Sequence, residues 1–330
     1  MKTLNYAATS ALFVGLTMAS CQKEKPSPAS EQLKNSDENI ETFFEENRAT
    51  QTLTYSINPQ MGGNITTPDG SQLIFEAGAI RNMNGGPISG NVIVRINDIY
   101  TRWEMLANNM PSETALSEPT TEGGPLSTGG SYTISIVTAG GNSVTIPNGG
   151  VKLTTSGDNT GGFNPGMTLW NGVQSDDQAR DKVWTASPTT LQTNDPEYSF
   201  PINNPVDMIN IDIPEIPLGK SGANHLIPKV YLPANFNADN TEIFVSVDGK
   251  NFLLTSLDSY VSSTSGNYWT DNSGYFSEGE NGNIIVVSKE GGVLKANITP
   301  FTATPNQSIT ISSIPTISLA NLKTAVETLP

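Results

Sequence analysis

The stretch GGSYTISIVTAGGNSVTI, residues 129–146, holds the pattern that decides the fold of this chain. Tyr132, Ile134 and Ile136 alternate with polar residues, which is the period of a strand with one buried face. A second alternating run follows residues 139–142, AGGN, and two strand patterns separated by a short Gly- and Asn-containing segment are typical of a hairpin. The stretch therefore predicts two antiparallel strands joined by a turn.

Similar patterns extend in both directions from this hairpin. Before and after it, strands are expected in 53–57, 70–80, 90–100 and 149–156, while 158–201 is less regular and is interpreted as the end of a domain plus a connector. A second series is expected in 208–213, 229–233, 241–254, 283–289 and 308–313, with a turn at DGKN, 248–251. Short strands punctuated by Gly and Asn favour an all-β fold of two antiparallel, Ig-like β-sandwich domains. The expected domains are 51–200 and 201–330.

Two helices complete the expected architecture. A short helix after a capping Ser36 places Ile40, Phe43 and Phe44 on one face. This face is expected to pack on the first domain, with a weak partner site as the alternative. Residues 318–329 predict a C-terminal amphipathic helix that covers a sandwich end or an exposed strand edge. Its capping residue and apolar stripe are Ser318, Leu319, Leu322, Val326 and Leu329.

The charge balance bears on the possible partners. The 330 residues include 17 basic and 32 acidic side chains, for a formal net charge of -15, and only 15% of the residues are charged. Such a chain repels phosphate backbones, so nucleic acid is not an expected partner.

The N-terminus predicts a secretory signal peptide. Residues 1–20 combine Lys2, an apolar run too short to span a bilayer, and small residues before a cut after Ser20. The next residue, Cys21, is the chain's only cysteine, so no disulfide can form within the chain. Residues 18–21, MASC, resemble the bacterial lipobox, and the resemblance implies acyl chains on Cys21 that anchor the protein in the outer membrane.

The segment after the cysteine predicts a tether, and its first residues resemble an export signal. Residues 22–35, QKEKPSPASEQLKN, are polar and contain two prolines, so they are expected to be extended or disordered, and the tether and short helix together occupy 21–50. Gln22, Lys23 and Glu24 resemble the surface-export signal of Bacteroidota lipoproteins, although Lys25 stands where that signal has a second acid. Exposure at the cell surface is therefore expected, with the periplasmic face as the alternative.

A family resemblance covers the first expected domain. GSQLIFEAGAI at 70–80, VIVRINDIY at 92–100 and the 129–146 hairpin resemble the β-sandwich of ankyrins and netrin receptors, which also occurs in uncharacterised Bacteroidota lipoproteins. Some members of that family cleave themselves at a His-Phe-Ser-type site. The single histidine here, His225, lies between Asn224 and Leu226 outside the matched region, so self-cleavage is not implied.

The sequence offers little for catalysis. With Cys21 acylated, no thiol remains as a nucleophile, and one histidine excludes zinc sites built from His and Cys. No cofactor or metal is expected. A hydrolase would need a pair of carboxylates, and none of the 32 acids, including Glu76 and Asp98, lies in a recognisable setting.

The best candidate for a ligand site is a group of aromatic residues. Tyr268, Trp269 and Tyr275 lie in a Gly-flanked segment and would suit a sugar or a protein partner if exposed; the alternative is that Trp269 packs in the second core. The leading interpretation is a lipid-anchored, non-enzymatic binding module. The alternatives are a glycan-capture accessory of a polysaccharide-uptake system and a hydrolase with an unidentified acid pair.

Overall fold

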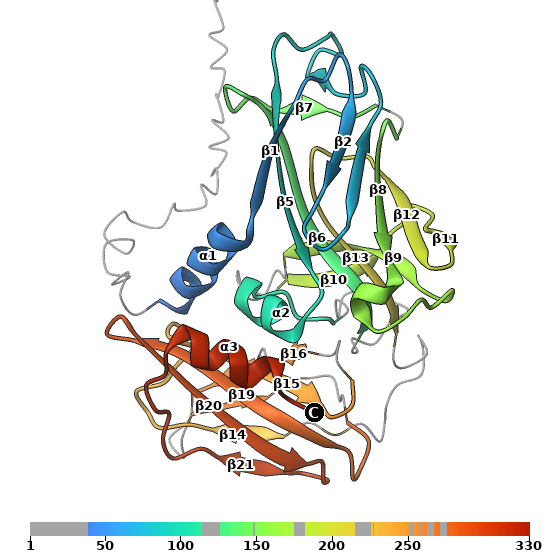
Figure 1. Ribbon diagram of the computed structural model, residues 1–330. Helices are drawn as coiled ribbons and strands as arrows, with labels where there is room; N and C mark the ends of the chain where they lie inside the picture. The colour runs from blue at the N-terminus through green and yellow to red at the C-terminus, as the bar shows by residue number, and fades with distance from the viewer. Residues whose placement is uncertain are drawn as a thin grey trace, which may run out of the picture. The chain divides into compact units, whose positions relative to one another are not determined.

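The computed structural model describes residues 39–113, 126–147, 149–174, 182–214, 226, 228–250, 254–257, 259–262, 267–270 and 276–330. These residues form a mostly β structure of several antiparallel sheets with three α-helices (Figure 1). None of the helices in these ranges has the length and hydrophobicity needed to cross a bilayer.

Two sheets share the N-terminal core, and we call them the first sheet pair. The six-stranded sheet has the order β1 (Leu53–Ile57), β5 (Val92–Ile99), β6 (Leu126–Thr138), β13 (Val206–Pro214), β9 (Thr168–Gln174) and β10 (Lys182–Ala186). The five-stranded sheet has the order β11 (Gln192–Asn194), β12 (Glu197–Ile202), β8 (Val151–Ser156), β3 (Gln72–Phe75) and β2 (Gly63–Thr66). Every pairing in both sheets is antiparallel.

The alternation of buried and exposed side chains along the strands explains why the two sheets pack face to face. Val94 of β5 and Ile136 of β6 are 0% exposed and are register partners, and they share a core with Leu153 and Phe200 of the five-stranded sheet. The predicted turn at 139–142 is confirmed: the Thr138 N–H donates to the Asn142 oxygen at 2.9 Å. The arm after it is shorter than predicted, because β7 (Val144–Thr145) pairs with β4 (Arg81–Asn82) instead of continuing along β6.

Two further sheets form the second sheet pair. One has the order β17 (Ser259–Val261), β18 (Tyr268–Thr270), β14 (Lys229–Tyr231) and β21 (Ser308–Thr310), with β14 and β21 parallel; the other has the order β16 (Leu254–Ser256), β15 (Thr241–Val247), β19 (Asn281–Glu290) and β20 (Val293–Thr302). β19 is buried on both faces, since Ile284 and Val286 face the other sheet while Ile285 and Val287 face the helices. A continuous apolar run is the sequence pattern of such a strand.

The pairing corrects the expected domain boundary. Residues 208–213 were predicted to open the second domain, but they lie in β13, which pairs with β6 and β9 of the first sheet pair. Residues 158–201, expected to be irregular, contain β9, β10, β11 and most of β12. Alternation along a strand reports which side chains are buried and carries no information about which sheet the strand joins.

Three helices share a core of their own with the β15–β19 face. They are α1 (Ile40–Gln51), α2 (Arg102–Asn108) and α3 (Leu319–Glu327), and Figure 1 shows them near one another. The amphipathic helix α3 is confirmed, with Ser318 as its cap and Leu322 and Val326 0% exposed. The helix α2 was not predicted from the sequence, although Thr101 and Glu104 form the reciprocal hydrogen bonds of a capping box.

The contacts of α1 correct another expectation. Its buried face is the predicted one, but the Phe44 ring packs edge-on against Phe244 of β15, with 6.2 Å between ring centroids. This helix therefore packs on the second sheet pair as well as on α2, and not on the first domain alone. Its cap is Asn39, whose side chain accepts the Glu41 N–H at 2.9 Å; the predicted cap, Ser36, lies outside the described residues.

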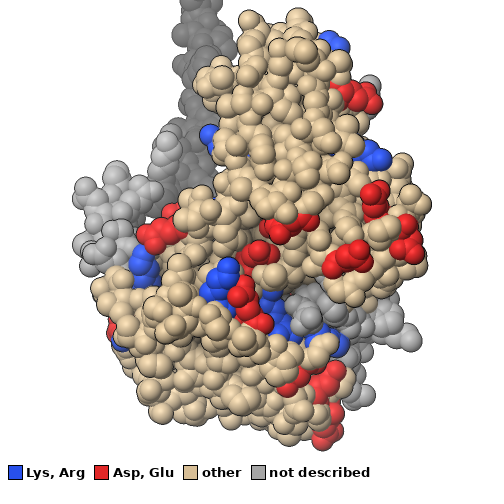
Figure 2. All heavy atoms as spheres, in the orientation of Figure 1, with Lys and Arg blue, Asp and Glu red and all other residues tan. Residues whose placement is uncertain are grey.

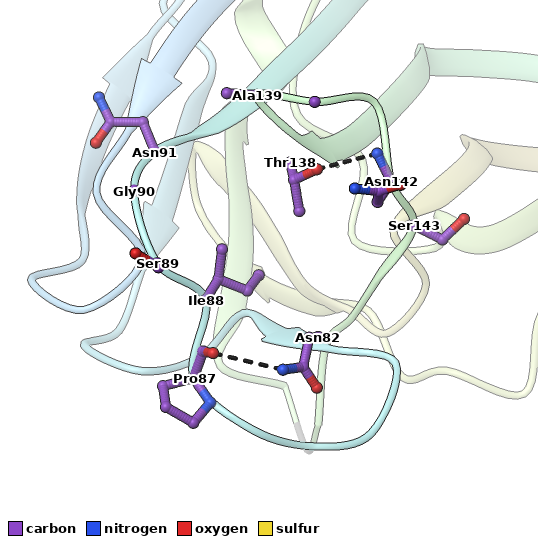
Figure 3. A pocket seen from close by; sticks show the side chains of 11 residues that line it. Asn82, Pro87, Ile88, Ser89, Gly90, Asn91, Thr138, Ala139, Asn142 and Ser143 are labelled. Carbon is purple, nitrogen blue, oxygen red and sulfur yellow. Dashed lines mark hydrogen bonds between the residues drawn. The ribbon is translucent and has the colours of Figure 1, made fainter.

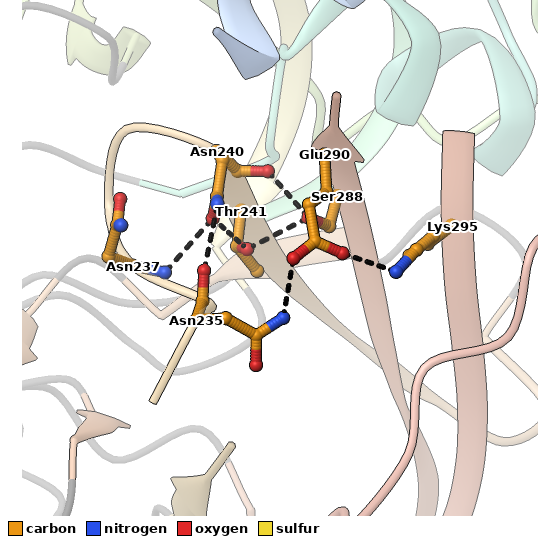
Figure 4. A network of polar contacts seen from close by, with 7 residues as sticks. All are labelled: Asn235, Asn237, Asn240, Thr241, Ser288, Glu290 and Lys295. Atoms are coloured by element: carbon orange, nitrogen blue, oxygen red, sulfur yellow. Dashed lines mark hydrogen bonds and ion pairs between the residues drawn. The ribbon is translucent and has the colours of Figure 1, made fainter. Parts of the chain in front are cut away.

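A network of polar contacts stabilises the loop at 235–240, which contacts the start of α1 (Figure 4). Asn240 is its centre: the side-chain Nδ2 donates to the Asn235 oxygen at 2.9 Å, Oδ1 accepts the Asn237 N–H at 3.0 Å, and the main-chain oxygen accepts the Ser288 hydroxyl at 2.8 Å. The Ile40 N–H at the start of α1 then donates to the oxygen of the neighbouring Asp239. These bonds pair the polar groups of the loop with one another and with β19, so we assign the network a structural role.

Candidate functional site: a cleft between two loops

A cleft of about 410 Å³ opens at the end of the first sheet pair that carries the β4–β7 pairing. We call it the loop cleft; it is lined by Asn82 and by residues 87–91, 138–140 and 142–143 (Figure 3). The two lining segments are more than forty residues apart in the chain, and the antiparallel pairings of β5 with β6 and of β4 with β7 bring them together. Its volume is within the range of about 300–1,000 Å³ usual for ligand sites.

Asn82 shapes the first wall of the loop cleft. Its side-chain Oδ1 accepts the N–H groups of Asn84 at 2.9 Å and Gly86 at 3.0 Å, which folds the loop around the amide. Gly85, between them, has a φ of +77°, a conformation that glycine adopts without steric cost. Because one side chain is bonded to two main-chain groups, this wall is held in a single arrangement.

The turn after β6 forms the second wall. Thr138 closes it, because its Oγ1 accepts the Asn142 N–H at 3.0 Å, and Gly141 has a φ of +81°. The Ala139 N–H donates to the Asn91 oxygen at 3.2 Å, so the two walls are directly bonded. Main-chain hydrogen bonds therefore set the width of the cleft before any ligand enters.

Several polar groups remain available inside this frame. The hydroxyls of Ser89 and Ser143 and the side-chain amide of Asn142 make no hydrogen bond to any described part of the protein, and all three residues are exposed. Each hydroxyl both donates and accepts, and the amide supplies two N–H donors and one oxygen acceptor. The lining residues all carry uncharged side chains. The site can thus form directional hydrogen bonds through groups that carry no charge.

The predicted aromatic site is only partly available. Trp269 is 2% exposed and packs in the second core, with its ring 4.8 Å from that of Tyr260, so the alternative that Trp269 belongs to the core is confirmed and its role as a platform is wrong. Tyr268 is half-buried beside Tyr231, with 5.2 Å between ring centroids. Tyr275 lies outside the described residues.

The other residues named from the sequence are outside the described ranges or are single acids, of which Glu76 is exposed after β3 and Asp98 is buried. Ser20, Cys21 and His225 are outside them. Asp98 is 7% exposed and accepts the Thr67 hydroxyl at 2.6 Å; burial raises the pKa of its carboxyl above the ordinary value. Within the described ranges, no group of three or more His, Cys, Asp and Glu side chains is placed to hold a metal ion.

The comparisons do not place the chain in a family: no protein-family model matches it, and no curated protein matches its sequence. The loop cleft was missed by sequence analysis. Its only local signals are the turn-rich segments NMNGGPISGN at 82–91 and TAGGNS at 138–143. Turn residues of this kind predict loops, and they do not predict that two loops will form one site.

Proposed function

We propose that this chain is a lipid-anchored, non-enzymatic binding module whose ligand enters the loop cleft. The observation that carries the proposal is the combination of two hydrogen-bonded walls with free Ser89, Ser143 and Asn142 groups between them. Amides and hydroxyls bind by hydrogen bonding and do not titrate near neutral pH, which suits recognition. Binding sites are also common on loops carried by a rigid β framework.

The proposal also includes a domain arrangement and a cellular location. We interpret the two sheet pairs as two Ig-like sandwich domains, joined through the helical core and carried on a tether that starts at an acylated Cys21. The tether sequence favours the outer membrane and the cell surface. In this arrangement the loop cleft belongs to the first domain, and the acyl chains hold the whole body at the membrane.

The binding proposal is tested with the full chain and a cleft-filling variant, Ser89→Trp. Ser89 is exposed and its side chain makes no described hydrogen bond, so the bulky substitution should block the cleft without unfolding the sheet. Glycan, peptide and lipid fractions of the cell envelope are passed over both immobilised proteins. We expect at least one fraction to be retained by the unmodified chain, recovered chemically unchanged, and lost with Ser89→Trp. Equal retention by both proteins, or retention of no fraction, would refute the proposal.

The anchor is tested separately. Cys21→Ala should release the protein from the membrane fraction and abolish labelling with radioactive palmitate, while Ser27→Ala, in the same segment, should change neither. Each buried methylene contributes about 0.8 kcal/mol, so loss of the chains should move most of the protein into the soluble fraction. A Cys21→Ala protein that stayed on the membrane to the same extent would contradict the proposed attachment.

A second candidate function is glycan capture at an aromatic surface. It is favoured by one specific observation: the half-buried rings of Tyr231 and Tyr268 are cross-strand neighbours on β14 and β18, and the Lys229 ammonium lies 5.4 Å from the centre of the Tyr268 ring. Adjacent aromatic rings on a sheet can stack on sugars. Tyr231→Ala would abolish retardation in a polysaccharide gel if this surface bound the glycan.

A further inference from the structure

We infer that the ligand of the loop cleft is a neutral carbohydrate. This inference rests on the proposed function, because it names the chemical class that the same cleft would bind. It follows from the charge, the hydrogen-bonding groups, the apolar contacts and the rigidity of the lining, each of which restricts the ligand differently.

The charge of the cleft excludes strongly ionic ligands. No lining side chain is charged, and Figure 2 shows few charged side chains over this end of the first sheet pair, in contrast to the region of the helices. A bound anion would lack the Arg or Lys partners that such ligands use, and would also approach a chain of net charge -15. A bound cation would lack carboxylates. The ligand should therefore be neutral.

The available groups match the hydroxyls of a sugar. Ser89 and Ser143 present hydroxyls, and Asn142 presents an amide that can donate to one sugar oxygen while accepting from another hydroxyl. A carbohydrate offers closely spaced donors and acceptors of this uncharged kind.

The lining also has small apolar surfaces between these polar groups. The ring of Pro87 and the methyl group of Ala139 are exposed on opposite sides of the cleft (Figure 3). Their size suits the C–H face of a sugar ring, whereas a peptide is usually recognised through a free strand edge or a deep apolar pocket. The N–H groups of Thr138, Ala139, Gly141 and Asn142 in the cleft turn are bonded within the protein, so side chains supply most of the donors available to a ligand.

The rigidity of the walls adds to the fit. Sugars are flexible and well hydrated, so a site that binds them must avoid further ordering costs of its own. Here Asn82 and Thr138 fix the two walls, and the Ala139–Asn91 bond joins them. The main chain that carries the ligand-facing side chains is therefore held in place before binding.

The test uses a panel of neutral oligosaccharides, acidic oligosaccharides and neutral peptides, titrated into the full chain and followed by calorimetry and by ligand-detected NMR. The variants are Asn142→Ala and Ser89→Trp, with Asn84→Ala as a matched control. Asn84 lies on the same loop outside the lining, and its side chain makes no hydrogen bond to the described protein. Tyr268→Ala tests the aromatic surface with the same ligands.

We expect at least one neutral oligosaccharide to bind, with an affinity that changes little between pH 5 and 9 or with salt, because no lining group titrates. Asn142→Ala should weaken binding about threefold to tenfold, the loss of one or two hydrogen bonds, and Ser89→Trp should abolish it. Asn84→Ala should bind like the unmodified chain.

Other outcomes separate the two levels of the proposal. Binding of a peptide or an acidic glycan that Ser89→Trp removes would overturn the ligand class and leave the binding function standing. Sugar binding that survives Ser89→Trp but is lost in Tyr268→Ala would move the site to the aromatic surface and overturn this inference. Absence of any binding in the panel, together with no fraction retained from the cell envelope, would overturn both.

Discussion

Replacing Arg102 by methionine should substantially weaken the connection between the two sheet pairs. Arg102 begins α2, is 4% exposed, and its two terminal nitrogens lie within 2.8–3.2 Å of four main-chain oxygens. These belong to Val247 and Lys250 at the end of β15 and to Leu329 and Pro330 after α3. One side chain thus joins segments more than one hundred and forty residues apart.

The expected loss follows from the burial of each bond. The bond to Val247 is buried, and a buried hydrogen bond from a charged group contributes about 1.5–3 kcal/mol, although the Val247 oxygen also accepts the Lys250 N–H at 3.3 Å. The other three bonds are partly buried, and water can replace much of each. Together the four bonds give a destabilisation of about 3–5 kcal/mol. For a body of this size that corresponds to a Tm lower by about 6–10 °C.

Thermal unfolding measured by circular dichroism tests the magnitude, and hydrogen exchange tests the location. Exchange should rise at the end of β15 and in the segment after α3. Arg95→Ala is the matched control, because Arg95 is exposed on β5 and its side chain makes no described hydrogen bond, so the change should stay within about 0.5 kcal/mol. If Arg102→Met lowered the Tm by no more than Arg95→Ala, the reasoning about these four bonds would be refuted.

Two further predictions concern buried groups. Burial raises the pKa of the Asp212 carboxyl well above its ordinary value, so the folded protein holds a proton that the unfolded chain loses, and stability is complete at acid pH and falls as the pH rises. Asp212→Asn should remove this part of the pH dependence in urea titrations and raise stability at pH 8; an unchanged slope would contradict it. Phe44→Ala should cost about 3–5 kcal/mol in the same assay, because the ring is 0% exposed against Phe244, whereas Glu45→Ala, exposed beside it, should cost little; equal effects would contradict the assigned packing.

Much of the secondary structure could be predicted from the sequence because it depends on local pattern. Alternation identified β5, β6 and β8, the turn at 139–142 followed from its Gly and Asn residues, and α3 followed from Ser318 and an apolar stripe. The elements that were not predicted lack a clear local pattern. The region of β9 to β12 has weak alternation, and the seven residues of α2 are too few to show a clear helical period.

The sequence by itself thus determined most of the strands, the helices α1 and α3, and which side chains seek burial, since these depend on neighbours one to four residues away. Only the tertiary structure decided the partners: that β13 joins β6, that α1 packs against Phe244, and that Trp269 is buried. The loop cleft was likewise decided only by the tertiary structure. Asn82 and Asn142 lie in unrelated turns of the sequence and share a site because β5 pairs with β6 and β4 pairs with β7, and such long-range register is set by the whole core rather than by local pattern.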